Sequence, residues 1–551
     1  MTHRDADESP DHHHHQLRNA VSLGPLRPAQ QPPDRTGHFD SLPLTRPASA
    51  PPPATTKVRV RVSTETPSVD PDAAPDAGCD RLRRRARRAL LLVAFLAGDV
   101  QDGVGPFLGV FLQEHGWNPG LRGTVFTVGL CVCMCMCVRK RLLLVIFSLL
   151  VGLAQGLNLL GTHPALIFST QMVSAVAGSS MGPLLVCLTL GIAAPSPPPP
   201  PPSSPPRPTS RWLRHGRRRT STAAAAAVAD HSFHGLNGRV QAANHAGIMV
   251  SAGLAAGLGT RFGLRSVFWL VLVSCFLAAA SVLLLLPERA IDHAAARGAP
   301  VPPPPSPSAA AARPAPPPGE DPPSPPPSAS VAALLFGNRP LLVIGTTVFF
   351  FHLGNAALLP LYGQALVAAG VADPAGTTGL TVLIAQAVMI PVSVLTAWWA
   401  QGGSDYWPLL ASYVVLPVRA GIAGLLSRRG WGVWPVQVLD GLGAGMQGVA
   451  VQGAVSTLMR GTGRVNVALG VAGGISRGTG AAVSALLAGW VAESRGYASA
   501  LYLLGLFPFV SQVLWLWQGK TMRPALSLGP ARGPEEDEMG EGRRGMGEPR
   551  P

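Results

Sequence analysis

Long apolar runs separated by short polar links dominate the chain from residue 89 to residue 518. A helix needs about 20 such residues to cross the hydrocarbon core of a bilayer. Because backbone N–H and C=O groups find no water there, each run must be helical. The pattern therefore predicts an all-α membrane protein with twelve transmembrane helices. The predicted spans are 89–112, 123–138, 142–161, 165–193, 243–264, 266–286, 340–361, 378–400, 408–426, 432–458, 465–491 and 498–518.

The segments between and beyond these runs are rich in Pro, Ser, Ala and charged residues. Such a composition favours disorder. The predicted parts are a disordered N-terminal tail (1–88), an N-terminal six-helix bundle (89–286) with a Pro/Arg/Ala-rich insertion (195–229), a Pro-rich cytoplasmic linker (287–339), a C-terminal six-helix bundle (340–518) and a disordered C-terminal tail (519–551). The N-terminus is polar and acidic, so we predict no cleavable signal peptide.

Composition and charge support this interpretation. Of the 551 residues, 47% are hydrophobic and only 13% are charged, whereas soluble domains carry about 25% charge. The net charge of +15 would suggest a nucleic-acid partner in a soluble protein, but the basic residues flank the apolar runs. With the N-terminus inside, the cytoplasmic flanks hold about four times as much Lys and Arg as the outer links. We therefore expect the bilayer as partner, both termini in the cytoplasm, and no nucleic-acid binding.

Short motifs recur in register between the two predicted halves. The matches join spans one and seven, four and ten, and five and eleven. They are Asp99-x-x-Asp102 with His352-x-x-Asn355, Gln171 with Gln437, and Gly238-Arg-Val-Gln241 with Gly463-Arg-Val-Asn466. Three matches in register indicate a duplicated, pseudosymmetric pair of six-helix bundles; chance similarity among Gly-rich helices is the alternative.

Several stretches of this sequence resemble a known family. They are Asp99-Val-Gln-Asp-Gly-Val-Gly-Pro-Phe-Leu-Gly-Val-Phe-Leu112, Asn237-Gly-Arg-Val-Gln-Ala-Ala-Asn-His245, Phe351-His-Leu-Gly-Asn355 and Trp434-Pro-Val-Gln-Val-Leu-Asp-Gly441. Over about 89–518 the chain resembles a group of bacterial permeases of the major facilitator superfamily (MFS). The resemblance implies two six-helix bundles around a central cavity, with helices one and seven lining it.

Three places depart from the family pattern. Where the family carries a Gly-Asp-Arg-Gly-Arg-type gating motif, this chain has a Cys-rich segment, Cys131–Cys137, followed by Arg139-Lys-Arg141. A thiolate metal site and misread intron sequence are competing explanations of that segment, and His12–His15 is favoured as a solvated run over a metal site. The 195–229 insertion and Arg477, a charge in the middle of span eleven, are the other departures.

Ionisable and amide side chains inside the spans are the candidates for chemistry, because such groups are costly in a membrane. Asp99 and Asp102 are three residues apart, which places them on one face of an α-helix. Two neighbouring carboxylates hinder each other's ionisation, so this pair is the first candidate for proton coupling, with helix packing or capping as the alternative. Further candidates for the cavity are His352, Asn355, Asp440, Gln437, Gln171 and Gln386, for which structural hydrogen bonding is the alternative.

Three arginines are assigned to helix ends or gating. Arg239 and Arg464 are predicted to anchor helix ends at the cytoplasmic surface. Arg419, late in span nine, is predicted either to extend outward or to pair with an Asp.

No enzyme constellation and no phosphate-binding G-x-x-x-x-G-K-[ST] loop is found, so we predict neither an enzyme nor a bound cofactor or metal. The predicted function is secondary transport of a small solute by alternating access, with proton coupling as a further hypothesis. One alternative is a non-transporting polytopic receptor or sensor whose Pro-rich loops recruit partners. A defective or misread transporter is another, because the gating motif is missing.

Overall fold

Helices make up nearly all of the described chain, and the one isolated strand pairing among these residues joins Ser404 to Ser527. The computed structural model describes residues 77–103, 105–127, 140–194, 211–297, 337–370 and 373–527. The Cys-rich segment 131–137, the His tract and most of the predicted tails and Pro-rich segments lie outside these residues. What the sequence indicates for those segments therefore stays a prediction.

The first set of helices covers the predicted N-terminal bundle. Its members are α1 (Ala77–Gly98), the π-helix η1 (Asp99–Gly103), α2 (Gly105–Glu114), α3 (Pro119–Thr127), α4 (Lys140–Leu157), α5 (Pro164–Ala193), α6 (Arg211–Phe262) and α7 (Arg265–Leu285), followed by the short 3-10 turns η2 (Glu288–Ala290) and η3 (Ala295–Arg297).

The second set covers the predicted C-terminal bundle. It consists of α10 (Arg339–Asn355), α11 (Leu358–Ala368), α12 (Pro374–Gln401), α13 (Tyr406–Leu425), the turn η4 (Gly430–Gly432), α14 (Val433–Leu458), α15 (Val465–Leu469), the π-helix η5 (Gly470–Ser476), α16 (Arg477–Arg495), α17 (Tyr497–Trp517) and α18 (Gly519–Ala525).

Eight helical stretches of the described chain are long and apolar enough to cross a membrane. They are Arg81–Glu114, Lys140–Leu157, Pro164–Ala193, Arg265–Leu285, Arg339–Ala368, Pro374–Gln401, Tyr406–Leu425 and Tyr497–Trp517. Helices α3, α6, α14 and α16 also lie at predicted spans but are not among the eight, so the count of twelve remains a prediction. The eight stretches establish a multi-pass, all-helical membrane protein.

Large apolar side chains cover the outside of the bundle, while many polar ones lie inside. Leu284 of α7, Trp398 of α12, Leu425 of α13 and Trp517 of α17 each expose more than 70% of their surface. A soluble protein rarely exposes such continuous apolar surface, whereas lipid accommodates it. The buried set includes Arg419, Gln437 and Thr381, so the polar chemistry of this protein lies in its interior.

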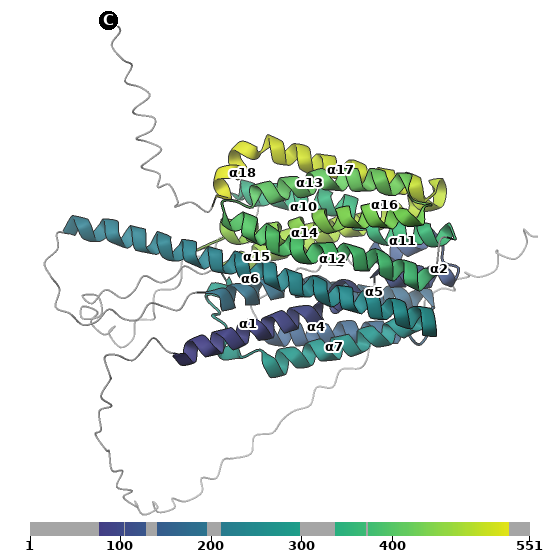
Figure 1. Cartoon of the computed structure of the whole chain (residues 1–551), viewed down its shortest axis with the longest axis horizontal. Helices are drawn as coiled ribbons and strands as arrows, with labels where there is room; N and C mark the ends of the chain where they lie inside the picture. Colours follow the sequence, from purple (N-terminus) through teal and green to yellow (C-terminus); the bar gives the residue numbers. More distant parts are fainter. Residues whose placement is uncertain are drawn as a thin grey trace, which may run out of the picture. The chain divides into compact units, whose positions relative to one another are not determined.

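The two sets of helices meet along α6 and α12, which pack side by side over much of their length. Helix α3 packs against α16 and α2 against α11, which adds two further contacts between the sets. On either side of this seam, α4 packs on α7, and α13 packs on both α14 and α17 (Figure 1). The seam therefore joins residues that are far apart in the sequence.

Several segments predicted as disordered are helical. Helix α1 begins at Ala77, within the predicted tail 1–88, and α6 begins at Arg211, within the predicted insertion 195–229. Both stretches are rich in Ala and Arg, which are strong helix formers, and both continue directly into a span. Part of the predicted linker forms η2 and η3, and α18 extends past the predicted C-terminal boundary.

Candidate functional site

A cavity of about 490 Å³ lies between the two sets of helices. Pockets for small molecules typically measure 300–1,000 Å³. Its wall is rich in side-chain amides, among them Gln101, Gln171, Asn244, Gln386, Gln447 and Gln452. Residues of α5 and α6 from the first set and of α12, α14 and α16 from the second contribute to one wall, so the space belongs to neither set alone.

Three interruptions of regular helix border this cavity. The π-helix η1 carries Gln101, the break between α10 and α11 follows Asn355, and the π-helix η5 directly precedes Arg477. π-Helical turns are rare and occur frequently at functional sites. In membrane proteins, irregular backbone is tolerated where it lines a cavity or is buried in protein. The sequence signals were Gly103 and Gly105 in span one and the pair Gly473-Gly474 in span eleven, but regular helices were predicted at these places.

Five of the predicted cavity residues line the cavity: His352, Asn355, Asp440, Gln171 and Gln386. These residues come from four helices, α10, α14, α5 and α12. Sequence pattern alone had brought them together only through the internal repeat and the family resemblance. Their role as substrate contacts remains a proposal.

The structure places two other predicted residues differently. Gln437 is completely buried in α14 and is not part of the cavity wall. Asp99 is also buried outside the wall, where the Ser251 hydroxyl of α6 donates a hydrogen bond to Asp99 Oδ1 at 2.5 Å. Of Asp99, His352 and Asn355, only the two residues of α10 therefore line the cavity.

The expectation that Asp99 and Asp102 share a face relied on α-helical spacing. Both residues lie in the π-helix η1, whose hydrogen bonds link residues i and i+5. A spacing of three residues therefore does not place two side chains on one face there, as it does in an α-helix. The side chain of Asp102 lies outside the described residues. Among the described side chains, Asp99 is held by the hydroxyl of Ser251.

An ion pair links α13 and α14 at the cavity wall, through the lining residue Asp440. Arg419 Nη1 lies 2.7 Å from Asp440 Oδ1, and both side chains are almost completely buried. The same nitrogen donates a hydrogen bond to Asn355 Oδ1 of α10 at 2.5 Å. Of the two predictions for Arg419, pairing with an Asp is the one that the structure supports. The pair neutralises Asp440, and the network holds three helices together.

The other two arginines behave more simply. Arg239 is exposed on α6, and Arg464 precedes the first residue of α15, where its backbone N–H donates to the Thr462 hydroxyl at 3.1 Å. Neither residue lines the cavity. Both positions are compatible with the predicted anchoring of helix ends.

Hydrogen bonds between the two sets cross beside the cavity. The Nδ1–H group of His245 in α6 donates to Gln386 Oε1 in α12 at 2.7 Å. One helical turn earlier, Gln241 Nε2 donates to Gln452 Oε1 in α14 at 2.9 Å. His245 and Gln241 lie within a family-like stretch of the sequence, but their partners were not predicted, because these pairs join residues more than 140 positions apart.

Contacts between the sets also close one end of the cavity, where α3 begins and α16 ends. Glu493 of α16 accepts hydrogen bonds from the backbone N–H of Gly120 at 2.9 Å and from Asn118 Nδ2 at 3.1 Å. The buried Arg122 guanidinium donates to Tyr497 OH at 2.9 Å. The sequence offered only isolated polar residues at these positions, and none was predicted.

A different set of contacts joins the two sets of helices where α12 ends and α13 begins. His234 Nε2 of α6 lies 3.2 Å from Asp405 Oδ2, which precedes α13, and both side chains are about 1% exposed. Gln401 Nε2 donates to the carbonyl oxygen of His231 at 3.0 Å. Moving the two sets of helices apart at this place would require these contacts to separate.

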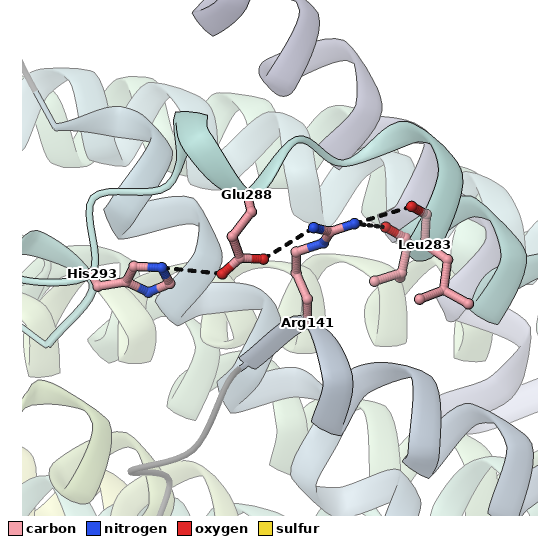
Figure 2. A network of polar contacts seen from close by, with 5 residues as sticks. Arg141, Leu283, Glu288 and His293 are labelled. Atoms are coloured by element: carbon pink, nitrogen blue, oxygen red, sulfur yellow. Dashed lines mark hydrogen bonds and ion pairs between the residues drawn. The ribbon is translucent and has the colours of Figure 1, made fainter. Parts of the chain in front are cut away.

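The basic end of the Cys-rich segment has a structural role that Figure 2 shows. Arg141 Nη1 pairs with Glu288 Oε2 at 3.0 Å, and His293 Nε2 lies 3.1 Å from the other carboxylate oxygen. Arg141 Nη2 also donates to the carbonyl oxygens of Val282 and Leu283, at 3.0 and 3.1 Å. Basic side chains stabilise a helix by bonding its last carbonyl groups, so Arg141 secures the end of α7 to the start of α4.

Comparisons with known proteins agree with this architecture. A model of the Major Facilitator Superfamily matches residues 220–481. Two uncharacterized MFS-type transporters of Mycobacterium tuberculosis, from strains CDC 1551 / Oshkosh and ATCC 25618 / H37Rv, are each 31% identical over 443 residues, which is 78% of this chain and 92% of theirs. The crystal structure of a variant of the nucleoside transporter NupG superposes with a TM-score of 0.52 at 11% identity, covering 78% of this chain and 99% of NupG. That last likeness concerns the fold.

Proposed function

This chain belongs to the major facilitator superfamily of transmembrane transporters, and we propose that it moves a small polar solute through its central cavity by alternating access. The observation that carries the proposal is that both sets of helices contribute to one amide-rich wall. Separate groups of hydrogen bonds join the sets where α3 begins and where α12 ends. Breaking one group while keeping the other would expose the cavity to one side at a time.

We further propose twelve membrane-spanning helices in two bundles of six, with both termini in the cytoplasm. Helices lie at the described parts of the predicted spans, and the start of α1 and helix α18 lie at the same end of the bundle (Figure 1). An even number of crossings requires the two ends of the chain to lie on the same side of the membrane. The excess of Lys and Arg on the same side supports its assignment to the cytoplasm.

Flux through reconstituted protein tests the transport proposal. Liposomes containing the full chain are loaded with a mixture of small polar metabolites, and their release is followed by mass spectrometry. Ala444 lines the cavity, whereas Ala387 of α12 is exposed on the outside of the bundle. We expect Ala444→Trp to abolish flux by filling the cavity, and Ala387→Trp to retain it. Equal flux through both variants would contradict a path through this cavity.

Proton coupling through Asp99 and Asp102 is a separate part of the proposal. Its support is chemical: a carboxyl group inside a membrane helix is costly and usually functional, and Asp99 is held between η1 and α6 by Ser251. Coupling predicts that an imposed pH gradient changes flux in the parent protein. It also predicts that this response is lost in Asp99→Asn or Asp102→Asn. A gradient response that survives both substitutions would refute the assignment.

A further inference from the structure

We propose that the transported solute is an anion whose carboxylate or phosphate group is bound by Arg477 inside the cavity. The inference rests on the proposed function, because it assigns a substrate class to the same cavity. It goes beyond that function by naming the charge of the solute and the groups that recognise it.

The charge of the cavity wall is the first support. Among the described lining residues, the arginines and acidic residues are Arg122, Arg477 and Asp440. Asp440 already has Arg419 as its partner at 2.7 Å, so the described part of the wall offers guanidinium groups to an anion and no unpaired carboxylate to a cation. Charges interact strongly where water is scarce. The wall therefore favours an anion over a neutral solute and disfavours a cation.

The placement of Arg477 distinguishes it from the other arginine of the wall. Arg122 is almost completely buried, and its guanidinium donates to Gln113 Oε1 at 2.8 Å and to Tyr497 OH at 2.9 Å. It is thus part of the contact that closes one end. Arg477, the first residue of α16 after the π-helix η5, lines the cavity with an exposed side chain. A guanidinium group that keeps exposed surface inside a membrane bundle can bind a ligand carboxylate or phosphate.

Unpaired amide groups on the same wall are the second support. The Nε2 atoms of Gln101, Gln171 and Gln447 are buried and have no hydrogen-bond partner within the described residues. They belong to three elements, η1, α5 and α14, and all three residues line this cavity. Buried donors without a partner are costly. A ligand that presents several acceptor oxygens would satisfy them, as carboxylates and phosphates do.

The neighbours of Arg477 support the orientation of one of these amides. His352 interacts with both Gln447 and Arg477. The amide oxygen of Gln447 is able to accept from the imidazole of His352, and its Nε2 atom has no hydrogen-bond partner within the described residues. The guanidinium of Arg477 and the Nε2 atom of Gln447 are thus two donors, from α16 and α14, on the wall of the same cavity.

A cationic solute would need an uncompensated carboxylate on the wall. Asp440 is paired, and Asp99 lies outside the wall with a hydroxyl donor. None of the described lining residues supplies another carboxylate. The chemistry of the wall therefore distinguishes between solutes chiefly by their negative charge.

Matched probes that differ in charge test the inference. Benzoate, benzamide and benzamidine have nearly the same shape, with charges of about −1, 0 and +1 at neutral pH, and phenyl phosphate provides the phosphate arm. The purified full chain in lipid nanodiscs is titrated with each probe, and the thermal unfolding temperature is recorded, since a ligand that binds the folded state raises it. We expect benzoate, phenyl phosphate or both to raise this temperature, and benzamide and benzamidine to leave it unchanged.

Variants connect the effect to the named residue. Arg477→Gln is expected to weaken anion binding by about 10- to 150-fold, the usual range for losing a hydrogen bond to a charged group, and Arg477→Lys to weaken it less. Arg495→Gln is the matched control, since Arg495 lies on the same helix but outside the cavity wall. Should Arg477→Gln fail to fold, Gln447→Leu provides a second variant with the same expected direction.

The outcomes separate this inference from the transport proposal. A larger shift with benzamidine, equal shifts with all three charge states, no shift with either anion, or anion binding unaffected by both Arg477→Gln and Gln447→Leu would each overturn the inference. Flux of neutral or cationic solutes without anion flux would also overturn it, but would leave transport standing. Arg477-dependent anion binding without any flux would support the inference and contradict transport.

Discussion

A single methyl group at the crossing of α3 and α16 should open one end of the cavity. Gly489 packs against the start of α3, and a Cβ atom at this position would lie 2.5 Å from the carbonyl oxygen of Pro119 and 2.9 Å from the Cα atom of Gly123. Both contacts are with backbone, which cannot rotate away. Ordinary contact begins at 3.4 Å, so Gly489→Ala requires the two helices to separate by about 0.9 Å.

Overpacking of this kind costs about 1–3 kcal/mol. The cost applies only while the two helices are in contact, because the methyl group meets nothing once this end has opened. The ratio of open to closed molecules should therefore rise by about 5- to 150-fold, if the helices do not relax in the closed state. Gly489→Val should shift the ratio further than Gly489→Ala.

Thiol labelling measures this shift. Ser174 lines the cavity, and Ser174→Cys in a background without other cysteines reports access to it through its rate of reaction with a membrane-impermeant maleimide. Gly421→Ala on α13 is the control, since a Cβ atom there would meet no atom within 4 Å. Labelling of Gly489→Ala and Gly489→Val at the rate of the parent and the control would refute the claim that this crossing closes the cavity.

Three further predictions concern contacts between helices. Arg419→Met leaves Asp440 buried without its ion-pair partner and should destabilise the protein by about 3–5 kcal/mol. Adding Asp440→Leu should recover much of this loss, and a double variant that is no more stable in thermal unfolding than Arg419→Met would contradict the prediction. Asp405→Ala removes the partner of His234 at 3.2 Å and should cost about 1–3 kcal/mol, which an unchanged unfolding temperature would disprove. Glu493→Ala removes the acceptor from the first turn of α3, a loss of about 1 kcal/mol. It should therefore speed maleimide labelling of the cavity, and an unchanged rate would argue against a role of Glu493 in closing the end where α3 begins and α16 ends.

The site was predictable from the sequence only in part. His352, Asn355, Asp440, Gln171 and Gln386 line the cavity, and they were candidates because polar and ionisable side chains are costly inside membrane helices. The contacts that close the cavity were missed, since Glu493 and Asp405 lie at helix ends where polar residues need no explanation. Arg477 stood out only as an unusual charge, and its place on the wall depends on α16 following η5.

The sequence by itself determined the helical membrane architecture and the approximate positions of the eight stretches that are long and apolar enough to cross a membrane. It could do so because a chain in lipid must satisfy its backbone hydrogen bonds within each spanning segment. This is a local requirement, so each apolar run indicates its own helix. Only the tertiary structure decided that η1 is a π-helix, that Asp99 bonds to Ser251, and that Arg419 pairs with Asp440. Those outcomes depend on which side chains come into contact across the bundle. The packing of helices that are distant in the sequence determines these contacts.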